Sequence, residues 1–274
     1  MSDLNEKLDN LGKKIENRGQ VNDVRLPSWP EAKRGTPNSF LRSALFSAVQ
    51  SKDRLNLKEA VLASQNGVSV KYTGEQLNQE DLALWENLVH LAKEKPLGNV
   101  CDLTAYEILK ALGLSDGAEN YKTLHSGIIR LTACAVQITH DGRTFFGPLI
   151  EGGVKDDATN HYVINLNKNL IKLYGATSWT AIDWPQRVQI GKKPLAQALH
   201  AYYSTHKEPY PVKLATLHKL TGSRNKQPSD FKRKIVVALS ELVQGDNTVE
   251  FVTVNVDQRY SPVFANIDLI LKTQ

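Results

Sequence analysis

Residues 104–133 read TAYEILKALGLSDGAENYKTLHSGIIRLTA. Thr104, with Glu107 three positions later, predicts a capping box that opens a short helix, and Gly113 predicts its end. After a short turn, apolar residues recur at helical spacing and predict an amphipathic helix over 121–133. Two helices joined by a tight turn are typical of the helix-turn-helix motif.

The flanking sequence supplies the other elements of one compact unit. A strand over 68–72 and a helix over 79–95 are predicted upstream. Downstream, an Asp-Gly turn at 141–142 between alternating runs predicts a β-hairpin over 136–146, and a strand over 161–165 completes the unit. A helix-turn-helix followed by a hairpin is the order of a winged helix.

The second half of the chain repeats this order. Its helices are predicted over 195–206, 213–220 and 229–243, the last with Ser229 as N-cap, and its strands over 248–256 and 263–271. Landmarks of the two halves agree in register. His90 and His200 are 110 positions apart, as are Tyr121 and Phe231, and Gly113 and Gly222 are 109 apart.

This repeat predicts an α+β fold with two tandem winged-helix domains, each a helix-turn-helix plus a β-hairpin wing. We expect a flexible N-terminal tail and linker over residues 1–35, domain 1 over 36–175 and domain 2 over 176–274. Prolines at 27, 30 and 37 indicate the linker. The tail carries apolar residues at helical spacing, which fits either a partner-binding or self-associating helix or a frayed tail with accidental spacing: Leu4, Leu8, Leu11 and Ile15.

Charge is concentrated in the C-terminal half of the 274-residue chain. The formal net charge is only +5, but residues 213–234 hold seven Lys or Arg against one acid, Asp230. Such a density of positive charge favours binding to a phosphate backbone, so we interpret the chain as a double-stranded-DNA-binding protein.

The predicted helix over 229–243 has the pattern of a recognition helix. Its apolar residues gather on one side, so its cations face the other side and can enter a major groove. The alternative is a merely solvated basic face. The candidate DNA-binding residues of this half are Arg224, Lys226, Ser229, Lys232, Arg233 and Lys234.

The corresponding helix of the first half is less basic. We expect weaker or less base-specific contacts from its outer face, with a purely structural helix as the alternative. Its candidate DNA-binding residues are Lys122, Thr123, Ser126 and Arg130, and Arg143 at the hairpin tip is a candidate wing contact.

The sequence carries no pattern that predicts catalysis, a metal site or a cofactor. Cys101 and Cys134 are isolated and are expected to be reduced and partly buried, and no phosphate-binding loop occurs. His200 and His206 flank Tyr202 and Tyr203, as in a DNA-nicking enzyme, but their spacing places the two histidines on different helix faces. Because no apolar run is long enough for a membrane span or a signal peptide, we expect a cytoplasmic protein.

Two blocks of the first half resemble a known family. Residues 26–46, LPSWPEAKRGTPNSFLRSALF, look like the opening segment of TrfA-type plasmid replication initiators. Residues 72–85, YTGEQLNQEDLALW, resemble the next block of that family, and His90-Leu-Ala continues it. The likeness extends to the end of the second repeat, where it concerns mainly layout and basicity.

The resemblance implies a protein that binds repeated sites, or iterons, at a plasmid origin and helps to open an adjacent A·T-rich region. It also implies host partners, namely DnaA, the replicative helicase and the sliding clamp, and conversion between a dimer and an active monomer. For the clamp motif Gln-Leu-x-Leu-Phe, only partial matches occur here, at 42–46 and 79–85.

Three hypotheses follow. The first is a non-enzymatic initiator whose two modules bind successive grooves of one iteron. The second is a dimeric winged-helix transcriptional repressor, which requires inverted-repeat sites and a stable dimer. The third is a DNA nickase that uses Tyr202 or Tyr203.

Overall fold

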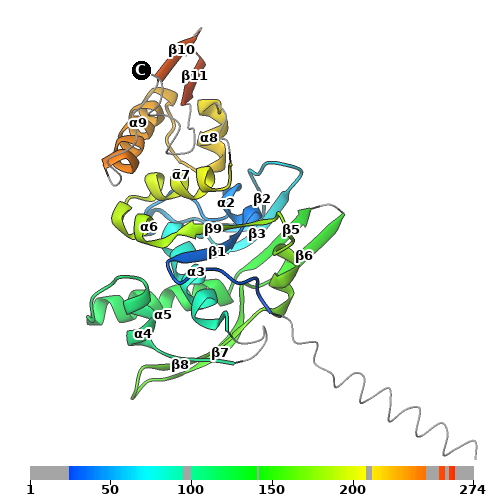
Figure 1. Cartoon of the computed structure of the whole chain (residues 1–274), viewed down its shortest axis with the longest axis vertical. Coiled ribbons are helices and arrows are strands. Elements are labelled where there is room, and N and C mark those ends of the chain that lie inside the picture. The colour runs from blue at the N-terminus through cyan, green and yellow to red at the C-terminus, as the bar shows by residue number, and fades with distance from the viewer. Residues whose placement is uncertain are drawn as a thin grey trace, which may run out of the picture.

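The computed structural model in Figure 1 describes residues 25–94, 100–140, 142–207, 212–244, 253–256 and 259–262. It is a mixed α+β structure, in which all the described sheets except the β10–β11 hairpin come from the first two thirds of the chain and helices dominate the last third. The apolar segment predicted at 4–15 and the strand predicted at 263–271 lie outside the described residues. No helix in the described part is both long and apolar enough to span a bilayer.

The first described strand pairs with a strand far along the sequence. β1 (Lys33–Pro37) runs antiparallel to β9 (Trp179–Asp183), with Lys33 opposite Asp183, and the short helix α2 (Asn38–Leu41) follows β1. Residues 33–35, which the prolines had placed in the linker, therefore belong to a strand. Local pattern cannot reveal this strand, because its partner is about 150 residues away.

A four-stranded antiparallel sheet carries much of the first core. Its order is β2-β3-β5-β6, formed by Asn56–Leu62, Ser69–Glu75, Ala135–His140 and Arg143–Gly147. The short 3-10 helix η1 (Ser51–Asp53) precedes it. Apolar residues that alternate along the strands bury one face of the sheet, among them Val70, Tyr72, Val136, Ile138 and Phe145. The predicted β5–β6 hairpin is confirmed by the pairing of His140 with Arg143.

Three helices and a second sheet complete the first half. The helices are α3 (Gln79–Ala92), α4 (Ala105–Ala111) and α5 (Ala118–Thr132). The sheet has the order β4-β8-β7, formed by Val100–Thr104, His161–Leu166 and Ile150–Asp156, and the 3-10 helix η2 (Lys168–Leu173) follows it.

The predicted capping box of α4 is confirmed. The Glu107 amide donates to Thr104 Oγ1 at 3.1 Å, and the Thr104 amide donates to Glu107 Oε2 at 2.7 Å. These two bonds satisfy backbone donors that the first helical turn otherwise leaves open. The cap therefore fixes where α4 begins, directly after β4.

The hairpin at 136–146 and the strand at 161–165, which were predicted to belong to one unit, share one core but lie in different sheets. β8 pairs with β4 and β7, whereas β5 pairs with β3 and β6 in the other sheet. β7 was missed because Gly152 and Gly153 interrupt its apolar pattern, although the turn residues from Asp156 to Asn160 mark a second hairpin. The hairpin that lies in the sheet beside α4 and α5 is therefore β7–β8.

The last third of the chain is mostly helical. It contains α6 (Trp184–Ile190), α7 (Pro194–Ser204), α8 (Leu214–Leu220) and α9 (Pro228–Gln244), followed by the hairpin β10–β11 (Thr253–Val256 and Arg259–Pro262). The prediction that Ser229 is the N-cap of the last helix is wrong. α9 begins at Pro228, and the Phe231 amide donates to the Gln227 carbonyl. Pro is favoured at the first helical position because it has no N–H to leave unpaired.

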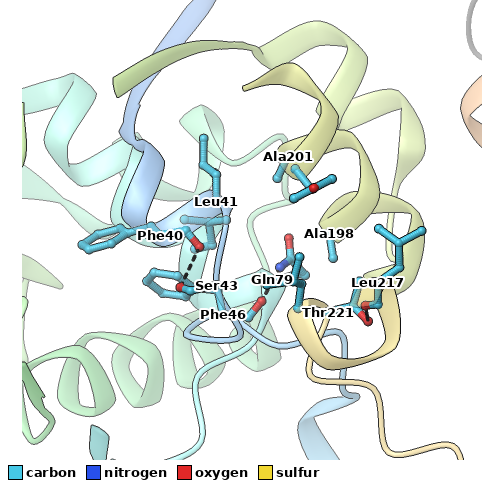
Figure 2. A pocket seen from close by; sticks show the side chains of 12 residues that line it. Phe40, Leu41, Ser43, Phe46, Gln79, Ala198, Ala201, Leu217 and Thr221 are labelled. Atoms are coloured by element: carbon cyan, nitrogen blue, oxygen red, sulfur yellow. Dashed lines mark hydrogen bonds between the residues drawn. The ribbon is translucent and has the colours of Figure 1, made fainter. Parts of the chain in front are cut away.

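The buried apolar residues form two clusters that meet closely. One lies among the elements from β1 to β9, and the other joins α7, α8 and α9. Figure 2 shows the boundary, where a cavity of about 10 Å³ is lined by Phe40, Phe46 and Gln79 from the first part and by Ala198 and Leu217 from the second. A cavity of that size holds about one water molecule, and α7 packs closely on α2 and α3.

A buried polar cluster links the same two parts. The carboxylate of Glu86 on α3 lies 3.4 Å from Nε of Arg187 on α6, and Thr36 Oγ1 donates to Glu86 at 2.8 Å. Arg187 also donates to the Gln79 side chain at 3.0 Å. Burial raises the pKa of Glu86, an effect that the charge of Arg187 opposes. The cluster therefore ties α6 to α3 at a site closed to water.

Candidate nucleic-acid interface

Helix α9 is held by its apolar side. Phe231, Ile235 and Leu239 are buried in the second core, and the ring of His218 on α8 meets the Phe231 ring edge-on at 4.7 Å. A ring nitrogen of His218 lies 2.8 Å from the Asn225 carbonyl, which fixes the turn between α8 and α9. The second core therefore holds α9 in a fixed orientation, with its other side facing outward.

The outer face and the preceding turn carry the predicted cations. Arg233 is 76% exposed and pairs with Asp230 at 2.9 Å within the first turns of α9. Lys234 Nζ donates to Asn225 Oδ1 at 2.6 Å, and Arg224 donates to the Asp53 carbonyl of η1. Lys226 and Ser229 are exposed, and Lys232 is half-buried. The six predicted residues of this half thus lie together, at and before the N-terminal end of α9.

Helix α5 packs on α3 through an unusually close contact. Leu124, Ile128 and Leu131 are buried, and a Cβ added at Gly127 would lie 2.7 Å from Leu84 of α3. On the outer side, Lys122 is 77% exposed, with only a loose approach to Glu119 at 3.8 Å. Thr123 and Ser126 are also exposed. These three predicted residues can reach a ligand in solution.

The structure corrects the assignment of Arg130. Its side chain is only 13% exposed, with Nε 3.0 Å from Asp81 and Nη1 3.3 Å from Glu75. Arg54 pairs with the same two carboxylates. Arg130 therefore belongs to an ion-pair cluster between α3 and α5, and the helical periodicity that predicted an outer position could not show that α3 covers it.

The structure also corrects the placement of Arg143. This residue is exposed at the start of β6, but β6 belongs to the four-stranded sheet and not to the sheet beside α4 and α5. In Figure 1 the β5–β6 hairpin lies on the right, whereas α5 lies at the lower left and α9 at the upper left. Arg143 is therefore not on the hairpin that accompanies the first helix-turn-helix.

The hairpin in that position, β7–β8, was not among the predicted site residues. Its turn is shaped by Asp156, whose carboxylate accepts from the Ala158 amide at 2.8 Å, and by Asn160 in a left-handed conformation at φ 52°. Lys155 pairs with Asp157 at 2.7 Å beside the turn. The Asp-Asp-Ala-Thr-Asn run at 156–160 is the sequence signal that could have located it.

The amino-acid sequence matches a known protein family. The sequence model described as TrfA protein matches residues 8–261 of this chain. The plasmid replication initiator protein TrfA of Escherichia coli is 29% identical over 249 residues, which cover 87% of this chain and 64% of that protein. The chain thus spans about 64% of the length of this relative.

Solved structures agree at the level of the fold. Domains 2 and 3 of RctB match with a TM-score of 0.55 at 12% identity, covering 85% of this chain and 99% of that one. The Pi initiator protein, solved in complex with iteron DNA, matches with a TM-score of 0.51 at 13% identity, covering 67% of this chain and 90% of that one. The mixed α+β fold is therefore shared with domains of replication initiators, and the family match over most of the sequence shows that the chain belongs to the TrfA family.

Proposed function

We propose that this chain initiates plasmid replication by binding iteron repeats at the origin, with α5 and α9 as its two DNA-reading helices. The observation that carries the proposal is the exposed basic group on and before α9, on a helix whose opposite side is locked in a core. Membership of the TrfA family and the fold shared with the iteron-bound Pi protein support it.

We assign the two helices to two winged-helix units. The order α3, β4, α4, α5 and the β7–β8 hairpin supports the first unit, and α7, α8, α9 and the β10–β11 hairpin support the second. We propose two approximate domains near the predicted bounds, but place them at 33–183 and 184–274 because β1 pairs with β9.

Because the chain belongs to the TrfA family, we also propose that it helps to open an A·T-rich region. We further propose that it recruits DnaA, the replicative helicase and the sliding clamp. We also propose that the chain self-associates and that it binds DNA without cleaving it. Tyr202 is buried and its hydroxyl donates to Gln65 at 2.8 Å, which supports a structural role for this tyrosine. Incubation of supercoiled origin DNA with the protein and Mg²⁺ should leave the DNA supercoiled, and nicking that a Tyr202→Phe/Tyr203→Phe variant loses would contradict this part.

The central test is footprinting on the origin DNA of the plasmid that encodes the chain. We expect protection of direct repeats, each about two helical turns of roughly 10 bp long, because each module covers about one turn. Protection of inverted repeats by a stable dimer would indicate the repressor instead, so the mass of the complex should be measured in the same samples.

Variants then assign the contact surface. If Arg233 contacts a base, Arg233→Ala should weaken binding to a single iteron by about 1–3 kcal/mol, or roughly 5- to 150-fold. Lys71→Ala, on the exposed side of β3, is the matched control and should bind like the wild type. Equal losses for the two variants would remove Arg233 from the interface.

A further inference from the structure

The outer face of α9 changes character along its length. Arg233 lies in its N-terminal half, and one turn later Val236 and Val237 are 44% and 54% exposed. At 100° per residue, these three side chains lie opposite the buried Phe231 and Ile235. The helix therefore presents a cation followed by two apolar branched side chains to solvent.

The core of the protein does not account for these valines. Neither belongs to the buried cluster that holds α9, and β-branched residues form helices less readily than Ala or Leu do. Polar groups nearby are engaged elsewhere. Asp230 pairs with Arg233, Glu241 pairs with Lys193 at 3.3 Å, and the Ser240 hydroxyl donates to the Val236 carbonyl at 3.0 Å. The middle of this face, at Val236 and Val237, is thus apolar and lies next to positive charge.

Duplex DNA offers one apolar group in its major groove. Guanine, cytosine and adenine present hydrogen-bonding edges there, whereas thymine adds a C5-methyl group that apolar side chains contact. The cations at the start of α9 can hold phosphates while the following turn lies over base edges. Ile129 gives α5 a similar combination, since it is exposed on the same side of its helix as Lys122 and Ser126.

We infer that Val236 and Val237 contact thymine methyl groups within the iteron and so determine part of its sequence preference. This inference rests on the proposed function, because it requires α9 to enter the major groove of a specific site. It assigns to the valines a role that the phosphate-binding cations cannot fill, since phosphate contacts carry no base sequence.

Thymine-to-uracil substitution tests the inference, because uracil lacks only the methyl group. Oligonucleotides carrying one footprinted iteron, each with a single thymine replaced, should be titrated with the full-length protein by fluorescence anisotropy. We expect wild-type affinity to fall about fourfold at one or two thymines, as the loss of one buried methyl predicts. Other thymines should tolerate the replacement.

Variants assign the effect to the valines. A Val236→Ala/Val237→Ala double variant should bind the thymine and uracil duplexes equally at those positions. Val61→Ala, which truncates a 71% exposed valine on β2, is the matched control and should keep the wild-type preference.

Each outcome decides the inference. Specific, salt-dependent iteron binding that is indifferent to uracil at every thymine would overturn it and leave the proposed function intact. A double variant that still distinguishes thymine from uracil would also overturn it. Failure of the wild type to bind any direct repeat would overturn the proposed function together with the inference. Because the uracil series uses wild-type protein, the first result does not depend on the folding of a variant.

Discussion

Arg130 and Arg233 lie on helices with similar apolar patterns, yet their guanidinium groups meet different surroundings. Arg233 extends into solvent beside Asp230, whereas Arg130 reaches the Asp81 carboxylate, of which only 2% is exposed. Arg54 shares that carboxylate with Arg130. The difference comes from α3, which covers one side of α5.

This difference predicts the effect of Arg130→Ala. The variant should lose about 1–3 kcal/mol of unfolding free energy, because a buried carboxylate oxygen is left without its hydrogen-bond donor. Urea denaturation measures the loss. Lys122→Ala, on the exposed side of the same helix, should stay within about 0.5 kcal/mol of the wild type. An Arg130→Ala protein of normal stability but weakened iteron binding would return Arg130 to the DNA interface.

His200 makes the stability of the fold depend on pH. Burial, followed by the charge of Arg187, lowers its pKa from 6.5 to about 3, and a ring nitrogen lies 2.8 Å from Gln186 Oε1. Because the folded-state pKa is the lower one, the unfolded chain takes up the proton first. The stability that neutral His200 provides is complete above about pH 6.5 and is lost as the pH falls from there toward 3.

Comparison with His200→Gln isolates this contribution. Between pH 7 and pH 5 the wild type should lose about 2 kcal/mol more than the variant, measured as unfolding free energy in urea. Gln can keep a hydrogen bond to Gln186 but does not titrate. Parallel pH dependences for the two proteins would show that His200 is not the titrating group.

At the scale of elements, local sequence signals were sufficient wherever the interaction itself is local. The Thr104–Glu107 capping box, the hairpin at 136–146 and the helices α3 and α9 follow from residues a few positions apart. Local sequence does not show which strand pairs with a hairpin. The pairing of β3 with β5, for example, joins residues more than 60 positions apart in the chain. The prediction thus found the β5–β6 hairpin but placed it beside the wrong helices.

The turn between α8 and α9 was located from the sequence by Gly222. The close packing around this glycine leads to a further prediction. Gly222 has φ +60°, and a Cβ there would lie 2.6 Å from Cβ of Ser47. Gly222→Ala should therefore cost about 2 kcal/mol or more, from backbone strain and from overpacking. Gly142→Ala has a similar φ of +70° but open space around it, and should cost only about 1 kcal/mol. Equal melting temperatures for the two variants would contradict the close contact.

At the scale of the molecule, the Glu86–Arg187 pair joins α3 to α6, and the α2–α7 boundary joins the first core to the helices that carry α9. No single-sequence pattern predicted this link, because Glu86 lies on the core side of α3 and Arg187 on a helix that was not foreseen. The basic group on α9, by contrast, was located from charge density and periodicity, since both are properties of one helix.

Removing one member of this pair should be more damaging than removing both. Arg187→Ala leaves Glu86 buried without its counter-charge and should cost about 3–5 kcal/mol. A Glu86→Leu/Arg187→Met variant should recover much of that loss, because it replaces the buried charges with apolar volume. Urea denaturation compares the unfolding free energies of the wild type, Arg187→Ala and the double variant. A double variant less stable than Arg187→Ala would show that the pair stabilises the fold by more than the attraction of its charges.

The β1–β9 ladder also sets the order in which the chain can be completed as it is made. Lys33 meets Asp183, so the first strand leaves the ribosome about 150 residues before its partner. At typical synthesis rates of about 5–20 residues per second, this delay is about 8–30 seconds. Throughout that interval β1 is an open edge, and the platform on which α6 and α7 dock is unfinished. Because α9 follows β9 in the chain, it is synthesised only after both strands of this ladder, and the unpaired β1 edge is exposed to misfolding until then.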